Sequence, residues 1–317
     1  MKPLKRIRNS LITTLTILII PSVYAGITFD FNYLPGSGFL DSTYGASRQA
    51  QLNIAANRLG SYFSGYTANL TFDIGEENEP GTLASAYSAL VSASPGFYNT
   101  VVQQKILGGI DANGAAADGH IYWNFASPGS LGNTVGAADY DFVSLAMHEL
   151  THTLGFGAGY SLTSGNYSRW IAFLTNKEGV PLIELNEDDR NAVVIGGNSF
   201  DENFNFVAGT NGTFFSGANA VAVYGGLVPI YSPNPFEDGS SLAHLDDYTF
   251  IGGSLMNAGS GFSQPQDYSI LEMAMLKDLG YTNLTAIPEP ATSAMMVAWA
   301  MAGFSVWRRR NGNRRRG

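Results

Sequence analysis

The feature that most constrains this chain is a pair of histidines, His148 and His152, four residues apart in an apolar segment. On an α-helix this spacing puts both imidazoles on one face, one turn apart, where they can hold one metal ion. Glu149 follows the first histidine and can take a proton from a water that zinc activates. We therefore expect a zinc site with His148 and His152 as ligands and Glu149 as general base. The competing interpretation is a chance match inside a core helix.

The segment around this motif has the signals of a single helix. Asp139 or Asp141 can cap its start by accepting hydrogen bonds from free backbone N–H groups. Gly155 can end it in the left-handed conformation that glycine tolerates. We predict a helix from Asp139 to Leu154.

A catalytic zinc site needs a third protein ligand and one open position. The chain has no cysteine, which excludes a disulfide scaffold, a thiolate zinc site and a cysteine nucleophile. Two further histidines remain, His120 and His244. His120 falls in a segment that we expect to be a strand, where a partly exposed structural histidine is the favoured interpretation. His244 follows a Gly-Ser-Ser turn and precedes two aspartates, Asp246 and Asp247.

The two ends of the chain differ from its body. Residues 1–25 combine basic residues, a short apolar run and a small-residue sequence before Gly26, which is typical of a secretory signal peptide. Residues 287–317 contain a Pro-Glu-Pro sequence, an apolar stretch and two arginine clusters. One interpretation of this tail is a plain C-terminal membrane anchor with its arginines held inside.

The order of these tail elements resembles the PEP-CTERM sorting signal of Gram-negative bacteria. The resemblance implies an exosortase-type sorting enzyme as a partner and transient anchoring in the inner membrane by the C-terminal helix. It also implies that the protein is exported to the outer surface or the medium. We therefore expect a signal peptide (1–25), a body that carries the zinc motif (26–286) and a sorting tail (287–317).

The body is strongly acidic. Without both ends, 7 Lys and Arg residues face 25 Asp and Glu residues, a net charge of −18. With so few basic residues, the body cannot neutralise the phosphates of a nucleic acid, so we expect no nucleic-acid partner. An acidic surface favours solubility and also allows for calcium (Ca²⁺) sites.

Hydrophobic periodicity predicts mixed structure before the motif. Alternation predicts strands over 27–31, 68–74 and 119–125, and helical spacing predicts helices over 47–63 and 84–93.

After the motif, abundant Gly, Asn and aromatic residues predict loops and hairpins. A short helix over 168–174 and a final helix over 269–279 are the exceptions.

His148, His152 and Gly155, with His244 and Met256 further on, resemble the zinc motif and methionine-bearing turn of metzincin proteases. The motif of that family continues to a third histidine at a position that is Ala158 here. Leishmanolysin-like metzincins keep the glycine and insert a long segment before the third histidine. The order of residues here is similar, with a longer insertion, and the segment 276–281 resembles the closing helix of the matrixin-like branch.

The metzincin resemblance implies an α+β zinc protease domain with a mixed twisted sheet, an active-site helix and an irregular C-terminal subdomain. It implies one catalytic Zn²⁺ held by His148, His152 and His244, with Met256 as an apolar floor beneath it. Glu149 would serve as base in the hydrolysis of peptide bonds in a protein or peptide substrate. Asp246 and Asp247 can orient the His244 imidazole, or they can be surface acids of a turn.

A rival third ligand is Glu187, which follows Asn186 as in the thermolysin-like gluzincins. The run 187–189 is acidic, however, and such runs are usually solvated loops. Glu187 would also leave Gly155 and His244 without a role, so we favour His244.

The sequence leaves two other functions open. One is a non-catalytic surface or biofilm matrix protein that contains zinc, against which Glu149 argues because a structural zinc site needs no base. The other is a binding module without metal, in which the motif is accidental.

Overall fold

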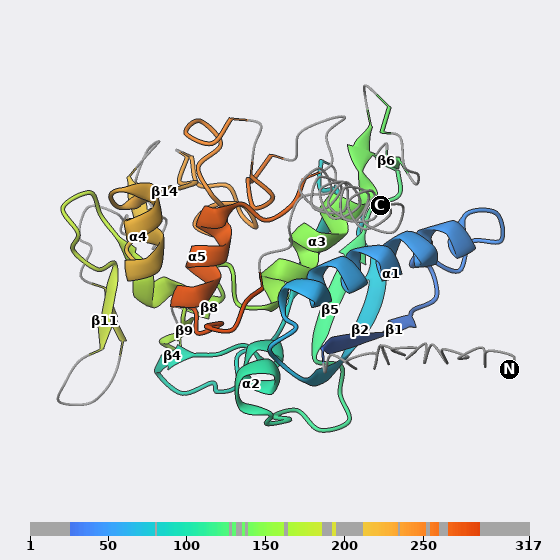
Figure 1. The fold of residues 1–317 in the computed structure, drawn as a ribbon, viewed down its shortest axis with the longest axis horizontal. Coiled ribbons are helices and arrows are strands. Elements are labelled where there is room, and N and C mark those ends of the chain that lie inside the picture. Colours follow the sequence, from blue (N-terminus) through green and yellow to red (C-terminus); the bar gives the residue numbers. More distant parts are fainter. Residues whose placement is uncertain are drawn as a thin grey trace, which may run out of the picture.

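The computed structural model describes residues 26–79, 81–126, 129–130, 135–136, 139–161, 164–185, 192–194, 212–233, 235–251, 254–259 and 266–285. These residues form a mixed α+β fold, as the sequence predicts (Figure 1). The predicted signal peptide and sorting tail lie outside the described residues. Across the described ranges, none of the helices has the length and apolar character needed to cross a membrane.

The first half of the fold is built on a four-stranded sheet with the order β1-β2-β5-β3. Three strands are parallel: β1 (Ile27–Tyr33), β2 (Ala68–Glu76) and β5 (Gly119–Trp123). Strand β3 (Ala84–Tyr87) pairs antiparallel with β5 and is an edge strand of the sheet. Alternate residues of β2 are buried, which gives the sheet one apolar face.

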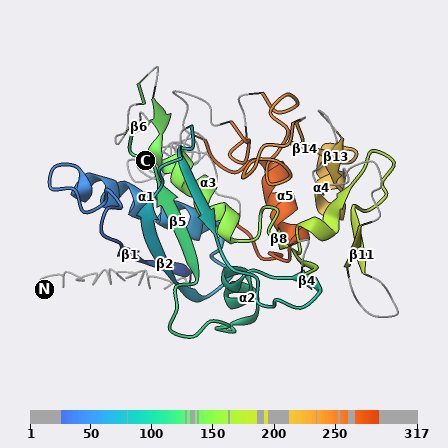
Figure 2. The same ribbon diagram turned by 180° about the vertical axis from the view of Figure 1, so that it is seen from behind.

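Two helices cover this apolar face. Helices α1 (Gly45–Tyr62) and α3 (Phe142–Thr153) pack against each other, and α3 also contacts β3 and β5. Figure 2, from behind, shows the strands in front of both helices. Leu52, Ala55 and Leu59 recur at helical spacing in α1 and are buried, which explains why the periodicity predicts this helix.

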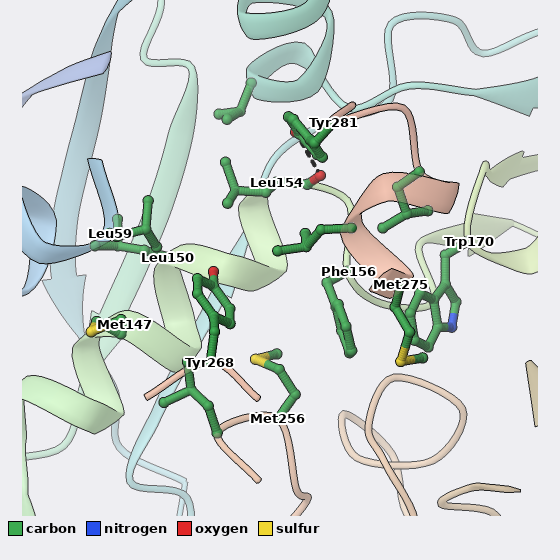
Figure 3. Packing of buried hydrophobic residues seen from close by; sticks show 14 of the residues in the cluster. Leu59, Met147, Leu150, Leu154, Phe156, Trp170, Met256, Tyr268, Met275 and Tyr281 are labelled. Atoms are coloured by element: carbon green, nitrogen blue, oxygen red, sulfur yellow. Dashed lines mark hydrogen bonds between the residues drawn. The ribbon is translucent and has the colours of Figure 1, made fainter. Parts of the chain in front are cut away.

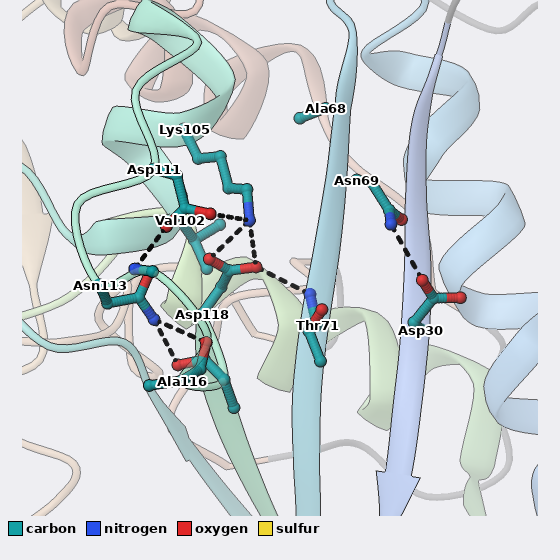
Figure 4. A network of polar contacts seen from close by, with 12 residues as sticks. Asp30, Ala68, Asn69, Thr71, Val102, Lys105, Asp111, Asn113, Ala116 and Asp118 are labelled. Carbon is teal, nitrogen blue, oxygen red and sulfur yellow. Dashed lines mark hydrogen bonds and ion pairs between the residues drawn. The ribbon is translucent and has the colours of Figure 1, made fainter.

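An ion pair with a fully buried carboxylate joins α2 (Val101–Gly108) to the sheet (Figure 4). Lys105 donates to both oxygens of Asp118 at 3.0 and 3.1 Å, and the side chain of Asp118 is fully buried. The backbone N–H of Thr71 on β2 donates to the same carboxylate at 2.8 Å. These bonds fix α2 beside β2 and β5, so the segment that follows β3 is held in place.

The second half is a set of short sheets and helices. The described elements of this half include three small sheets. One joins β10 (Leu174–Thr175), β13 (Thr213–Phe215) and β14 (Val228–Ile230), and a second joins β4 (Gly96–Tyr98), β9 (Asn166–Ser168) and β8 (Tyr160–Ser161). The third pairs β11 (Ile183–Leu185) with β12 (Ala192–Val194). A two-stranded pair, β6 (Gly129–Ser130) and β7 (Tyr140–Asp141), precedes α3. Helices α4 (Ala218–Tyr224) and α5 (Ile270–Asp278) pack together in this half (Figure 1).

Two predicted helices are wrong. The segment 84–93 begins with strand β3, because pairing with β5 and stacking of Tyr87 on His120 outweigh the helix preference of its alanines. The segment 168–174 contains only the 3₁₀ turn η1 (Ile171–Phe173), since the residues on either side pair into two different sheets. The other predicted helices and strands are confirmed to within a few residues.

Candidate metal centre

Helix α3 carries the first two histidines and has a well-defined start. Asp141 is its N-cap, and one carboxylate oxygen accepts from the backbone N–H of Ser144 at 2.8 Å. The sequence left Asp139 and Asp141 as alternatives, and the structure selects Asp141. Most of the helix is buried, including Glu149, so its position relative to the sheet is fixed.

Side chains from distant segments hold the end of α3. The Thr100 hydroxyl donates to the carbonyl of Thr153, and the Tyr281 hydroxyl donates to the carbonyl of Leu154, both at 2.8 Å. Gly155 then turns the chain with a φ of +90°, and a Cβ there would lie 2.8 Å from Oε1 of Gln103. Both the backbone conformation and the limited space therefore favour glycine at this position.

The structure brings three histidines together. The Nε2 atoms of His148 and His152 lie 3.0 Å apart, and Nε2 of His244 lies 3.1 Å from each of them. His148 and His244 are buried and His152 is partly buried, and together the three form a group that can hold a metal ion. His244 comes from the loop before Asp246, far from α3 in the sequence.

Backbone carbonyl groups orient the three rings. Nδ1 of His148 bonds to the carbonyl of Leu255 at 2.7 Å, and Nδ1 of His152 bonds to that of Phe156 at 2.7 Å. Nδ1 of His244 bonds to the carbonyl of Ser240 at 2.8 Å. A carbonyl oxygen can only accept, so each Nδ1 carries the proton and each Nε2 presents a lone pair.

Three converging lone pairs repel one another unless a cation lies between them. Their separation is near the spacing of about 3.3 Å that a tetrahedral ion with bonds of about 2.0 Å to nitrogen would impose. The donor set therefore fits a metal ion that accepts neutral imidazole ligands.

Burial also keeps these imidazoles neutral. Loss of solvation lowers the pKa of His148 to about 4 and that of His244 to about 3, and it lowers the pKa of His152 well below its usual value. The mutual repulsion of the rings adds to the effect on His152 and His244. At neutral pH the group is therefore ready to bind a metal without first losing protons.

A cleft of about 480 Å³ opens onto these histidines, and Glu149 lies in its wall. All of β3 lines one side of the cleft, and residues 155–159 and 238–244 contribute to its other walls. Burial, assisted by the charge of Glu77, raises the pKa of Glu149 to about 8. A cation bound to the histidines would lower that pKa again, because it favours the ionised carboxylate.

Met256 lies in the buried core next to the loop that carries His244. Its side chain is fully buried in the same cluster as Tyr268 and Phe156 (Figure 3). Its carbonyl accepts from the N–H of Leu245 at 2.8 Å, so the methionine turn and the His244 loop are joined directly.

The remaining candidate residues lie elsewhere. The ring of His120 on β5 stacks on Tyr87 and does not belong to the three-histidine group. Ala158 lines the cleft without offering a ligand atom. Glu187 lies outside the described residues.

The sequence left two roles open for Asp246 and Asp247, and the structure shows neither aspartate bonded to the His244 ring. Asp246 is completely buried, so it is not a surface acid either. The carbonyl of Ser240 bonds to the His244 ring, while Asp246 accepts from Thr249 and Asp247 accepts from the N–H of Gly259. A backbone oxygen thus orients the His244 ring, where the sequence allowed for a carboxylate. Within the described ranges the three histidines are the group that can hold a metal, so a calcium site stays a prediction.

Comparison with protein-family models, with curated proteins and with solved structures found no match to this chain. What the site does must therefore be inferred from its own residues.

Sequence reasoning missed the groups that support the metal centre. The carbonyls of Phe156, Ser240 and Leu255 give no side-chain signal, since any residue offers a carbonyl. The sequence analysis also missed the capping box that Ser269 and Glu272 form at the start of α5, although their spacing matches the Ser-x-x-Glu pattern.

Proposed function

We propose that this chain is a zinc-dependent endopeptidase of the metzincin type. The observation that carries the proposal is the arrangement of His148, His152 and His244, whose Nε2 atoms converge in an open cleft beside the buried Glu149. Three protein ligands with access to a cleft are the pattern of catalytic zinc, whereas structural zinc is closed by four.

The choice of zinc rests on the donor chemistry together with the metzincin resemblance. Neutral imidazoles suit zinc, copper, iron and nickel, and a catalytic zinc site with three protein ligands is common in hydrolases. The metzincin resemblance of Gly155, His244 and Met256 supports zinc among these ions. When bound, zinc supplies an activated water and polarises the carbonyl group that is attacked.

Glu149 has the position for proton transfer. It is next to His148 in the sequence, lines the same cleft and can accept a proton from the attacking water. The same carboxyl group can then donate the proton to the leaving amine of the cleaved peptide. Burial raises the pKa of this carboxyl group and a bound cation would lower it, so the two effects oppose each other at Glu149.

Strand β3 offers a binding surface for the substrate. It is an edge strand that lines the cleft along its whole length, so an extended peptide can add to it by backbone hydrogen bonds. Gly, Ala and Ser make up much of the other cleft wall, which leaves room for substrate side chains. We infer a protein or peptide substrate bound in an extended conformation.

We also propose that the protein is exported and sorted to the outer surface or the medium, with transient anchoring in the inner membrane. The proposal depends on the two end segments, residues 1–25 and 287–317. Fractionation of cells that express the full chain, with and without residues 287–317, tests it. Retention of both forms in the cytoplasm would contradict it.

Zinc content and casein cleavage, measured side by side, test the enzymatic proposal. The variants are Glu149→Gln, His244→Ala and the control His120→Ala, which removes a histidine outside the group. We expect one zinc per chain in the parent, Glu149→Gln and His120→Ala, and no stable zinc in His244→Ala. Cleavage should persist in His120→Ala and fall by roughly 10²–10⁴-fold in Glu149→Gln, the usual contribution of a general base.

Two outcomes would contradict the proposal. If His244→Ala keeps both zinc and activity, the third ligand is another residue, and Glu187 is the one to test. If the parent binds zinc but cleaves neither casein nor a diverse peptide library, the chain is a zinc-containing surface protein instead.

A further inference from the structure

One peptide group links His148 to a buried carboxylate. The carbonyl of Leu255 bonds to Nδ1 of His148 at 2.7 Å. On the other side of the same peptide bond, the N–H of Met256 donates to Oε1 of Glu272, also at 2.7 Å. Carboxylate, peptide and imidazole thus form one continuous chain of hydrogen bonds that ends at the metal-facing Nε2.

We propose that Glu272 is a positioning residue of the metal centre, acting on His148 through the Leu255–Met256 peptide. The inference rests on the proposed function, because it concerns the affinity of the same three histidines for zinc. A carboxylate that accepts from a peptide N–H polarises the peptide and makes its carbonyl a stronger acceptor. A histidine whose Nδ1–H meets a stronger acceptor is a more basic ligand at Nε2.

The Glu272 carboxylate is held rigidly. Its side chain is completely buried, and its second oxygen accepts from the N–H of Ser269 at 2.7 Å. The Ser269 hydroxyl in turn accepts from the N–H of Glu272 at 3.2 Å, which completes a capping box at the start of α5. The position in the first turn of α5 favours a negative charge, because free N–H groups of the helix point toward it.

The same segment also reaches a second ligand. The carbonyl of Met256 accepts from the N–H of Leu245, the residue after His244, and Leu245 forms a bridge with Asn257. Glu272 therefore holds the Leu255–Met256 segment, which orients His148 and is also bonded to the loop that carries His244.

A capping box alone does not require a carboxylate here. At α2 the corresponding residue is Gln103, whose amide nitrogen donates to the carbonyl of Leu279 at 2.8 Å. At Glu272, by contrast, each of the two side-chain oxygens faces an N–H donor. Glutamine offers one acceptor oxygen and would place an N–H₂ group against the second donor, so only an acid satisfies both.

The test compares Glu272→Gln with Ser269→Ala in the full chain. Ser269→Ala is the matched control, because it weakens the same helix cap but leaves the bond from Met256 to Glu272 in place. The readouts are zinc affinity, by competition with a chromophoric chelator, and the visible absorption spectrum of the cobalt(II)-loaded protein. Both are measured below the unfolding temperature of each variant.

We expect Glu272→Gln to bind zinc about 10–100-fold more weakly than the parent, the usual effect of losing a group that supports a metal ligand. Its cobalt spectrum should change, because the orientation and basicity of His148 change. Ser269→Ala should lose thermal stability while it keeps the zinc affinity and the cobalt spectrum of the parent. Equal zinc affinities in the two variants would overturn the inference, since Glu272 would then act as a helix cap alone.

A second measurement needs no variant and applies even if Glu272→Gln fails to fold. In the NMR spectrum of the parent, zinc binding should shift the amide proton of Met256, whereas that of Glu272, bonded to the Ser269 hydroxyl, should shift little. Equal shifts of the two amides would overturn the inference.

The failure of this inference differs from the failure of the proposed function. A parent that binds zinc but cleaves no peptide leaves the role of Glu272 intact, since neither readout requires cleavage. A parent that binds no zinc overturns both.

Discussion

Nε2 of His148 lies 3.1 Å from Nε2 of His244, although 96 residues separate the two in the chain. One ring is carried by helix α3 in the sheet-based half, and the other by a loop of the second half. A metal ion at this point would therefore tie the two halves of the fold together.

Zinc should stabilise the fold through His244. At a free zinc concentration of 100 times Kd, the free energy of unfolding should rise by about 2.7 kcal/mol. Urea unfolding with and without zinc measures this gain. His120→Ala should show the same gain as the parent, and His244→Ala should lose it. An undiminished gain in His244→Ala would show that zinc binds elsewhere.

The metal-free protein should be sensitive to acid because of its buried histidines. The folded-state pKa of His244 is about 3, whereas the unfolded chain takes up the proton near pH 6.5. This contribution to stability is present above pH 6.5 and is lost as the pH falls toward 3. Between pH 6.5 and 5 the loss from His244 alone is on the order of 2 kcal/mol.

A variant separates this contribution from those of other groups. His244→Leu should lose less stability than the parent between pH 7 and 5, measured by urea unfolding in the presence of a chelator. The raised pKa of Glu149 has the opposite sign, since it favours the folded state at lower pH, but it is present in both proteins. Parallel pH profiles for parent and variant would contradict the prediction.

Loss of Lys105 should strongly destabilise the fold. Lys105→Met leaves the fully buried carboxylate of Asp118 without its cation, and breaking a buried pair in this way costs about 3–5 kcal/mol. The control is Lys177→Met, which removes an exposed pair with Glu178 and should change stability by less than about 0.5 kcal/mol. Equal urea midpoints for the two variants would show that the Asp118 carboxylate is stable without its partner.

Gly155→Ala should destabilise the end of α3 more than a matched glycine substitution elsewhere. Gly109 also has a positive φ, of +64°, but a Cβ there meets nothing within 4 Å. Gly109→Ala should therefore cost about 1–2 kcal/mol for the backbone conformation alone. Gly155→Ala adds the clash with Gln103 and should cost roughly 1–3 kcal/mol more. Chemical unfolding of both variants gives the comparison.

The parts of the site that the sequence predicts are local in the chain. The positions of His148 and His152 on one helix face, and the turn at Gly155, depend on spacing within a single segment. His148 and His152 lie on the same side of α3, as predicted, because a helix places residues four apart on one face. The family resemblance added His244, whose approach to α3 no local pattern could have predicted.

The wrong predictions arose where distant parts of the fold decide the outcome. The alanines of 84–93 prefer helix in isolation, yet Ala84 and Ala86 pair with β5 in the edge strand β3. Asp246 and Asp247 were plausible partners for His244, but the nearby carbonyl of Ser240 satisfies that ring. A sequence does not indicate which backbone carbonyl will contact a given side chain, because every residue has one.

The carbonyls of Phe156, Ser240 and Leu255 belong to three separate stretches of chain, and each aligns one ring of the metal site. A chain that has folded only as far as Phe156, just beyond α3, holds two imidazoles and one of these carbonyls. The third ring and the other two carbonyls arrive with the last part of the body. Completion of the fold is thus itself the step that assembles the group of three histidines.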